Sequence, residues 1–260
     1  MLFFDPTETL TSFGYLPPSL QANYGLLVSE TGELVQLPVL PPSTNQMTRT
    51  ATLNIDGSGK LTGTVEEIRT GPAEDELRDE LAAVPKIERQ KVFQSLLSRV
   101  SDGAVLTRAS ITDLGNFTSP LIIEYGFTLS GYAQHLGNLY LFRPCALGHK
   151  GEDLLEDKPR QQPVVFSHTA QETDSFEISF PAEYSMDEVP RPMQYDSPFA
   201  GYKSELHGDA HTLHYSRMYE LKNLRVQLEQ VKELKQFFRT ISDDERAYAI
   251  LTSSSSVSQK

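Results

Sequence analysis

A β-hairpin is predicted by residues 51–65, which read ATLNIDGSGKLTGTV. Apolar or small residues alternate with polar ones on both sides of a turn: Ala51, Leu53 and Ile55 before it, and Leu61, Gly63 and Val65 after it. Because successive side chains of a strand point to opposite faces, this pattern indicates two strands that bury one face. Asp56-Gly57-Ser58-Gly59 supplies the turn. It lacks the alternating acidic ligands and closing glutamate of a calcium loop.

Two helices are expected after the hairpin. Pro72 opens the first, in which Glu74 precedes Arg78 by four residues, and Pro85 ends it. The second presents one apolar face, made of Phe93, Leu96, Leu97 and Val100. Negative charges gather early in the first helix, where the helix dipole favours them: Glu74, Asp75, Glu76, Asp79 and Glu80. We interpret that acidic run as a solvated face and not as a cation site.

Strands dominate the rest of the chain. Three are expected at 104–112, 121–129 and 138–142, and four more at 164–168, 175–180, 199–206 and 212–221. The polar residues 148–162 separate the two groups and resemble a linker. Near the end, Val231, Leu234, Phe238 and Ile241 form a helical apolar stripe. Residues 242–245 resemble a capping box that starts a fresh helical turn.

These patterns predict an α+β protein that is mostly β. We expect strands at 1–40, a middle α+β unit with a helical pair at 41–150, an antiparallel β-sandwich at 151–226, terminal helices at 227–252 and a disordered tail at 253–260. The boundary near residue 40 rests on Pro38, Pro41 and Pro42, which make a stiff connector.

Composition excludes several classes of function. Acidic residues outnumber basic ones by 35 to 23, giving a net charge of -12, so a nucleic-acid partner is not expected. A single cysteine excludes an internal disulfide and a zinc site built on pairs of thiolates. No apolar run is long enough for a membrane span, and the chain as given carries no export signal.

The first line carries a resemblance to a known family. It contains Leu2-Phe3-Phe4-Asp5-Pro6-Thr7, then Phe13-Gly14-Tyr15-Leu16-Pro17, then Gly25-Leu26-Leu27-Val28. Ordered in this way, these phrases resemble a branch of the bacterial transglutaminase-like proteins, which are cysteine hydrolases of the papain-fold superfamily. Later phrases resemble a β-rich domain of unknown function in the same branch: Lys158-Pro159-Arg160, Pro163-Val164-Val165-Phe166, Phe180-Pro181-Ala182-Glu183-Tyr184, Val189-Pro190-Arg191-Pro192 and Tyr215-Ser216-Arg217.

The resemblance implies that Asp5 is the acid of a cysteine–histidine–aspartate triad, whose cysteine and histidine precede it in the family. The chain is then expected to be a C-terminal accessory region, with 1–40 the end of the catalytic domain. Its implied partner is that catalytic domain or a cell-envelope protein, and the parent protein is expected to be exported to the periplasm or the cell envelope. No cofactor or metal is expected. From the residues alone, an acid before Pro6 is the Asx-type turn typical of such dipeptides.

Two other sets of residues suggest chemistry less strongly. Cys145 and His149 could form a nucleophile and base, but free cysteines are usually buried, and Pro144 and Gly148 argue against a helix that would stack the pair. A metal site is suggested by three histidines, His207, His211 and His214. On a strand, however, the side chains of His211 and His214 would point to opposite faces. A stand-alone sandwich that binds peptide or carbohydrate is the main alternative, and exposed Tyr195, Phe199 and Tyr202 would favour it.

Overall fold

The structure, a computed structural model, describes Phe3, Asp5, Leu16, Pro17 and residues 19–112, 114–150 and 160–253. The protein is α+β and mostly β. Three parts of the chain lie outside the described residues. They are most of the sequence phrases that contain Asp5 and Phe13, residues 151–159 of the expected linker, and the tail from residue 254.

The largest sheet runs, within the described residues, in the order β12-β13-β14-β10-β3-β4-β6-β5. Its strands are β3 (Gln46–Ile55), β4 (Leu61–Arg69), β5 (Val105–Ile111), β6 (Leu121–Leu129), β10 (Ala170–Ser179), β12 (Gln194–Asp196), β13 (Ala200–Gly208) and β14 (Thr212–Leu221). Neighbouring strands are antiparallel except β3 and β10, which pair in parallel with Ala51 opposite Phe176. The hairpin predicted at 51–65 is confirmed as β3 and β4, with Ala51 opposite Val65.

That parallel pair changes the expected arrangement of units. The strands expected to form a separate sandwich after residue 150 instead continue the sheet that begins with β3, so one sheet crosses the proposed boundary. A sandwich is present, but its second layer is a smaller sheet, in the order β11-β16-β8-β7. It contains β7 (Gln134–Leu136), β8 (Leu139–Phe142), β11 (Tyr184–Glu188) and β16 (Ala249–Ser253). Leu53 and Phe176 of the large sheet and Phe142 and Leu251 of the small sheet share one core.

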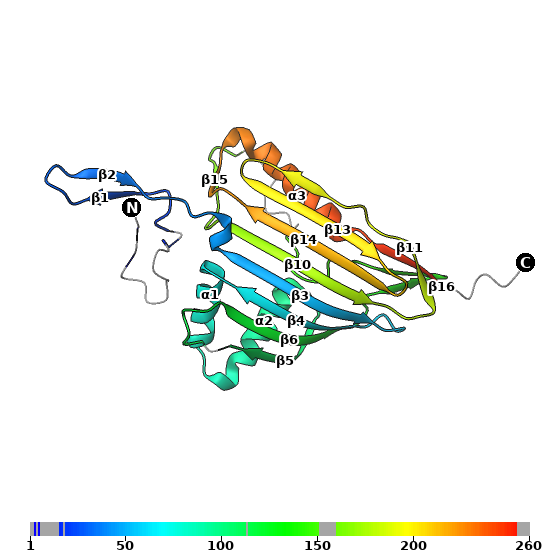
Figure 1. Ribbon diagram of the computed structural model, residues 1–260. Coiled ribbons are helices and arrows are strands. Elements are labelled where there is room, and N and C mark those ends of the chain that lie inside the picture. Colours follow the sequence, from blue (N-terminus) through cyan, green and yellow to red (C-terminus); the bar gives the residue numbers. More distant parts are fainter. Residues whose placement is uncertain are drawn as a thin grey trace, which may run out of the picture.

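Helices cover the same face of the large sheet on either side of the small sheet (Figure 1). The predicted helical pair is confirmed as α1 (Pro72–Ala82) and α2 (Arg89–Val100), which bury Leu77, Leu81 and Phe93 against β6. At the other side α3 (Val231–Arg246) buries Leu234, Phe238 and Ile241, as its apolar stripe predicted, against β13 and β14. No helix in the described residues has the length and apolar character to cross a membrane.

The fresh helical turn predicted at 242–245 is wrong. These residues are the last turn of α3, which ends at Arg246. The chain then forms strand β16, which pairs with β8 in antiparallel orientation. The apolar residues Ala249 and Leu251 alternate with Ile250, and their period of two fits this strand.

A small hairpin projects from the body of the molecule (Figure 1). It consists of β1 (Tyr24–Leu27) and β2 (Glu33–Gln36), which pair only with each other among the described strands. Two further short strands, β9 (Val164–Val165) and β15 (Arg225–Val226), pair beside the start of β10.

Candidate functional site

Four charged residues occupy inward positions of the central strands. Arg49, Glu67, Asp174 and Arg217 share the phase of their strands' buried apolar residues, and each is at most 4% exposed. Strand register places them in one line, with Glu67 opposite Arg49, Arg49 opposite Asp174, and Asp174 opposite Arg217. The sheet therefore buries a row of alternating charge at its centre.

Ion pairs join this row without a break. Arg69 Nη2 lies 2.5 Å from Glu67 Oε1, and Arg49 Nε lies 3.1 Å from Glu67 Oε2. Arg49 Nη1 lies 2.6 Å from Asp174 Oδ1, while Arg217 Nε donates to the other Asp174 oxygen at 2.8 Å. We call Arg69, Glu67, Arg49, Asp174, Arg217 and Glu245 the ion-pair row. Its three positive and three negative charges balance.

The row ends on α3. Arg217 Nη1 lies 2.9 Å from Glu245 Oε1, and the preceding residue, Asp244, accepts hydrogen bonds from three hydroxyls. These come from Tyr202 at 2.6 Å, Ser204 at 2.8 Å and Tyr215 at 3.3 Å. The acids that resembled a capping box thus bind α3 to β13 and β14.

Mutual pairing keeps the row charged despite burial. Burial opposes the charge of Arg49, but Asp174 and Glu67 outweigh it and raise its pKa. Burial likewise opposes the charge of Arg217, and Asp174 more than compensates, so its pKa is raised well above the usual value. For Glu67, burial raises the pKa, yet Arg49 and Arg69 lower it overall. The row can hold the sheet in register, and the shifted pKa values of Arg49, Arg217 and Glu67 all favour the charged forms of these three groups.

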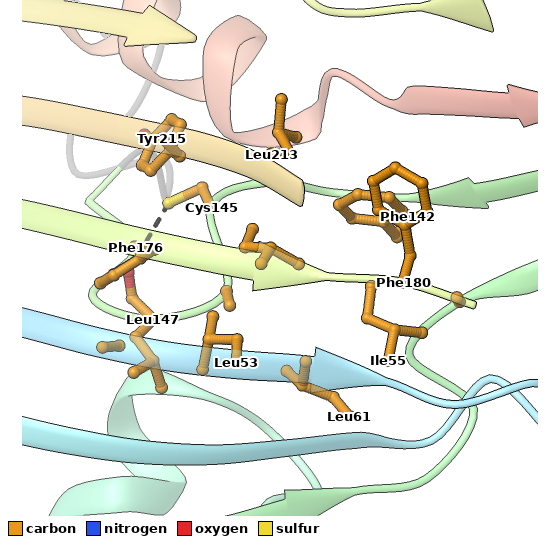
Figure 2. Packing of buried hydrophobic residues seen from close by; sticks show 14 of the residues in the cluster. Leu53, Ile55, Leu61, Phe142, Cys145, Leu147, Phe176, Phe180, Leu213 and Tyr215 are labelled. Carbon is orange, nitrogen blue, oxygen red and sulfur yellow. Dashed lines mark hydrogen bonds between the residues drawn. The ribbon is translucent and has the colours of Figure 1, made fainter. Parts of the chain in front are cut away.

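Cys145 lies in a buried loop that crosses this row. Its thiol donates to the Leu147 carbonyl at 3.6 Å, as Figure 2 shows, and Arg217 Nη1 lies 3.4 Å from the sulfur. Burial raises the pKa of the thiol to about 12. His149 is exposed, whereas Cys145 is 2% exposed. The interpretation of Cys145 as a buried core thiol is confirmed, and nucleophilic chemistry with His149 has no support.

The three histidines do not converge. His207 and His214 lie opposite each other on β13 and β14, with their rings stacked at 4.9 Å. The His211 ring instead packs edge-on against the Phe180 ring, with 6.2 Å between the ring centroids. The side chain of His211 therefore points away from that of His214, as predicted. The described residues contain no group of three His, Cys, Asp or Glu side chains that could hold a metal ion.

Asp5 is half-buried and has no regular secondary structure. Pro6 and Thr7, which complete its phrase, lie outside the described residues. Its role as a triad acid stays a prediction.

A groove of about 1060 Å³ lies where the hairpin meets the body. One wall is the first half of α1, with Asp75, Glu76 and Asp79. The facing wall has apolar character, from Val165, Phe166 and Leu224, together with His168 and Arg225. The foot of the hairpin closes one end through Gln21, Asn23 and Tyr24.

Two buried amides hold the walls of this groove in place. Gln21 donates to the Leu16 carbonyl at 3.0 Å and accepts from the Leu40 amide at 2.9 Å. Asn45 donates to the Thr169 carbonyl at 2.7 Å and accepts from the Ala73 amide at 3.0 Å. Because Gly71 provides no side-chain cap for α1, Asn45 satisfies a free amide of its first turn from a distance. These hydrogen bonds fix the start of α1 and the segments that flank the hairpin on the groove.

Electrostatics give the α1 wall a distinct character. Partial burial raises the pKa of Asp75 to about 7, and the neighbouring carboxylates Glu74 and Asp79 add to the rise. Glu74 is paired with Arg78 at 2.6 Å, as its spacing predicted. The wall attracts cations, and a cation beside Asp75 would favour its ionised form.

The hairpin next to the groove exposes large apolar side chains. Leu26 and Leu34 lie opposite each other and are 66% and 71% exposed. Tyr24 and Val28 are also exposed, at 68% and 92%. Such residues gathered on a small element differ from the scattered single apolar residues of ordinary surfaces.

The sequence carried a signal for the ion-pair row that was missed. Arg49 continues the alternation of Ala51 and Leu53, and Arg217 continues that of Leu213 and Tyr215. A charged residue in the inward phase of a strand predicts a buried charge that needs a partner. Which partners meet could not be derived, because it depends on strand order.

Comparison with known proteins gives a partial match. Residues 137–251 match a family described as a "Domain of Unknown Function with solved-structure structure" (DUF3858). The matched segment begins before β8 and ends within β16. It contributes Asp174, Arg217 and Glu245 to the ion-pair row, whereas Arg49 and Glu67 lie before it. No curated protein matches the chain.

Proposed function

We propose that this protein is a non-catalytic accessory module that binds a partner protein through the hairpin β1–β2 and the adjoining groove. The exposed pair Leu26 and Leu34 carries the proposal. A two-stranded hairpin is marginally stable alone in water, and its stability normally requires packing against another element. Among the described strands β1 and β2 pair only with each other, and Leu26 and Leu34 stay exposed, so a partner that covers these side chains would stabilise the hairpin.

The chemistry of the surface defines the partner. The partner should present an apolar surface to the exposed side chains of Leu26, Leu34 and Tyr24. It should also place lysine or arginine beside the acidic wall at Asp75. Apolar burial would supply most of the affinity, and charge would supply orientation. The partner we infer is the catalytic domain of a transglutaminase-like cysteine hydrolase. Supporting this choice are the resemblance of the Asp5 phrase to that family and the domain of unknown function at 137–251.

The environment of Cys145 supports the non-catalytic part of the proposal. The thiol of Cys145 has a raised pKa and lies buried in the core shared by the two sheets, so it is a poor nucleophile. Iodoacetamide at neutral pH should label Cys145 only as fast as the protein unfolds, and urea should accelerate labelling. Rapid labelling of the folded protein, or amide hydrolysis that Cys145→Ser abolishes, would show a catalytic protein instead.

Binding can be tested with a separately expressed transglutaminase-like domain from the source genome. Titration calorimetry should detect a complex with the wild type and lose it with Leu26→Asp plus Leu34→Asp. Leu136→Asp is the matched control, because Leu136 is also 66% exposed but lies on β7. Unchanged affinity in the double variant, or equal loss in the control, would refute the hairpin as the binding element.

The alternative, a sandwich that binds carbohydrate or peptide through an aromatic edge, has lost its motivating feature. Phe199 and Tyr202 are each 1% exposed and pack in the cluster under α3. Tyr195 is half-buried, contacts Phe237 and donates to the Glu233 carbonyl at 3.0 Å. These rings stabilise the attachment of α3 and present no binding platform.

A further inference from the structure

A second, smaller cavity lies between α2 and the strands β4 and β6, near the end of the large sheet that is opposite to β13. Its volume is about 90 Å³. Four apolar side chains line it, Phe93, Leu96 and Leu97 from α2 and Ile123 from β6, together with Tyr125. The remaining lining residues are charged: Glu67, Arg69 and Arg99. The cavity is thus an apolar space at the end of the ion-pair row.

The charges around this cavity are unequal. Glu67 is already shared between Arg49 and Arg69, at 3.1 Å and 2.5 Å, so it offers no unbalanced negative charge. Arg99 differs, because its side chain is 63% exposed and its ion pair with Glu80 is long, at 3.7 Å. Exposed pairs of this kind are weak and readily exchanged. Arg99 can therefore leave Glu80 for a better placed carboxylate at the mouth of the cavity.

We propose that this cavity binds a small apolar group that carries a carboxylate, with the apolar group between Phe93 and Ile123 and the carboxylate on Arg99. The space of about 90 Å³ is smaller than the engineered apolar cavity of about 150 Å³ that accepts benzene, so it would enclose an isobutyl group, or part of a phenyl ring whose remainder lies in the open mouth. Such a group occurs in two sources, a free small carboxylic acid and the C-terminal residue of a polypeptide. Both present the same chemistry to Arg99.

3-Phenylpropionate tests the proposal, with its neutral amide as the matched control ligand. Titration followed by methyl resonances of Leu96, Leu97 and Ile123 should show saturable shifts with the acid and at least about fivefold weaker binding of the amide. Arg99→Ala should weaken binding of the acid to the level of the amide, and Arg99→Lys should restore part of it. Lys91→Ala, at an 80% exposed position of the same helix, should change nothing.

Filling the cavity gives an independent test. Leu96→Trp should abolish the shifts caused by the acid while thermal unfolding shows that the variant remains folded. Comparison of a peptide ending in a free Phe carboxylate with 3-phenylpropionate then separates the two sources, since the tighter ligand identifies the source. Equal binding of acid and amide, no binding of either, or full binding by folded Leu96→Trp would overturn the proposal.

Discussion

Arg217 donates a hydrogen bond of 2.7 Å from Nη2 to the carbonyl oxygen of Gly148. This contact places the loop that contains Cys145 directly on the ion-pair row. Gly148 has a φ of +74°, and a Cβ atom there would lie 2.4 Å from Arg49 Nη1 and 2.8 Å from Arg217 Nη2. Only glycine allows the backbone to approach both guanidinium groups. A residue expected to begin a linker is thus part of the centre of the fold.

Gly148→Ala should destabilise the protein by about 3 kcal/mol or more, because it combines a left-handed backbone with displacement of buried, paired arginines. Urea unfolding measures this change. Gly131→Ala provides the control, since Gly131 has a similar φ of +70° but no atom within 4 Å of its added Cβ. It should cost about 1 kcal/mol. Equal losses in the two variants would show that packing against the arginines contributes nothing.

Arg217→Met should lower the free energy of unfolding by about 3 to 5 kcal/mol, since it leaves Asp174 and Glu245 buried with fewer partners. Chemical denaturation measures the loss. Lys203→Met, which removes an exposed pair with Glu205, should change stability by less than about 0.5 kcal/mol. If Arg217→Met were as mild as this control, the row would have no role in stability.

Asp75 should make the protein less stable as pH rises. Its pKa is about 7 in the folded protein against 3.8 in its ordinary state, so between these values the folded state binds more protons than the unfolded state. Stability therefore falls between about pH 4 and pH 7 and then levels off. Because the carboxylate is partly exposed, we expect solvent screening to reduce the effect to about 1 kcal/mol.

The variant Asp75→Asn should remove this dependence. Its melting temperature relative to the wild type should rise between pH 4 and pH 7, and the difference should stay constant above pH 7. NMR titration of the Asp75 carboxyl carbon gives a direct reading. A midpoint near 4 would contradict the prediction.

The hairpin β1–β2 should be the least stable described element of the isolated protein. Its amides should exchange with solvent almost as fast as those of an unfolded chain, because two strands without a covered face open easily. Amides of β14, which pairs on both sides with β10 and β13, should exchange only on global unfolding. Hydrogen exchange followed by NMR measures both. Equal protection would mean that the hairpin is stable without a partner.

Local sequence patterns predicted the elements of this fold well where one face is buried. The alternation at Leu53 and Ile55 identified β3, and the stripe at Leu234 and Phe238 identified α3. Prediction failed where charge replaced apolar residues at inward positions. Asp244 and Glu245 suggested the capping box of a new helical turn, because nothing nearby in the chain indicates that they pair with Ser204 and Arg217.

The sequence by itself determined the class of the protein, the position of most of its long strands and helices, and the burial of Cys145, whereas β10 begins at Ala170, five residues before the expected start. These follow from periodicity and composition, which act within a few residues. Only the tertiary structure decided that β10 pairs with β3, that one sheet joins the two halves, and that Arg49 and Arg217 share the carboxylate of Asp174. The pairing of β10 with β3 and that of Asp174 with Arg49 join residues more than a hundred positions apart, and Asp174 and Arg217 are 43 positions apart. They depend on which complete arrangement buries the apolar faces while giving every inward charge a partner, and no local pattern encodes that choice.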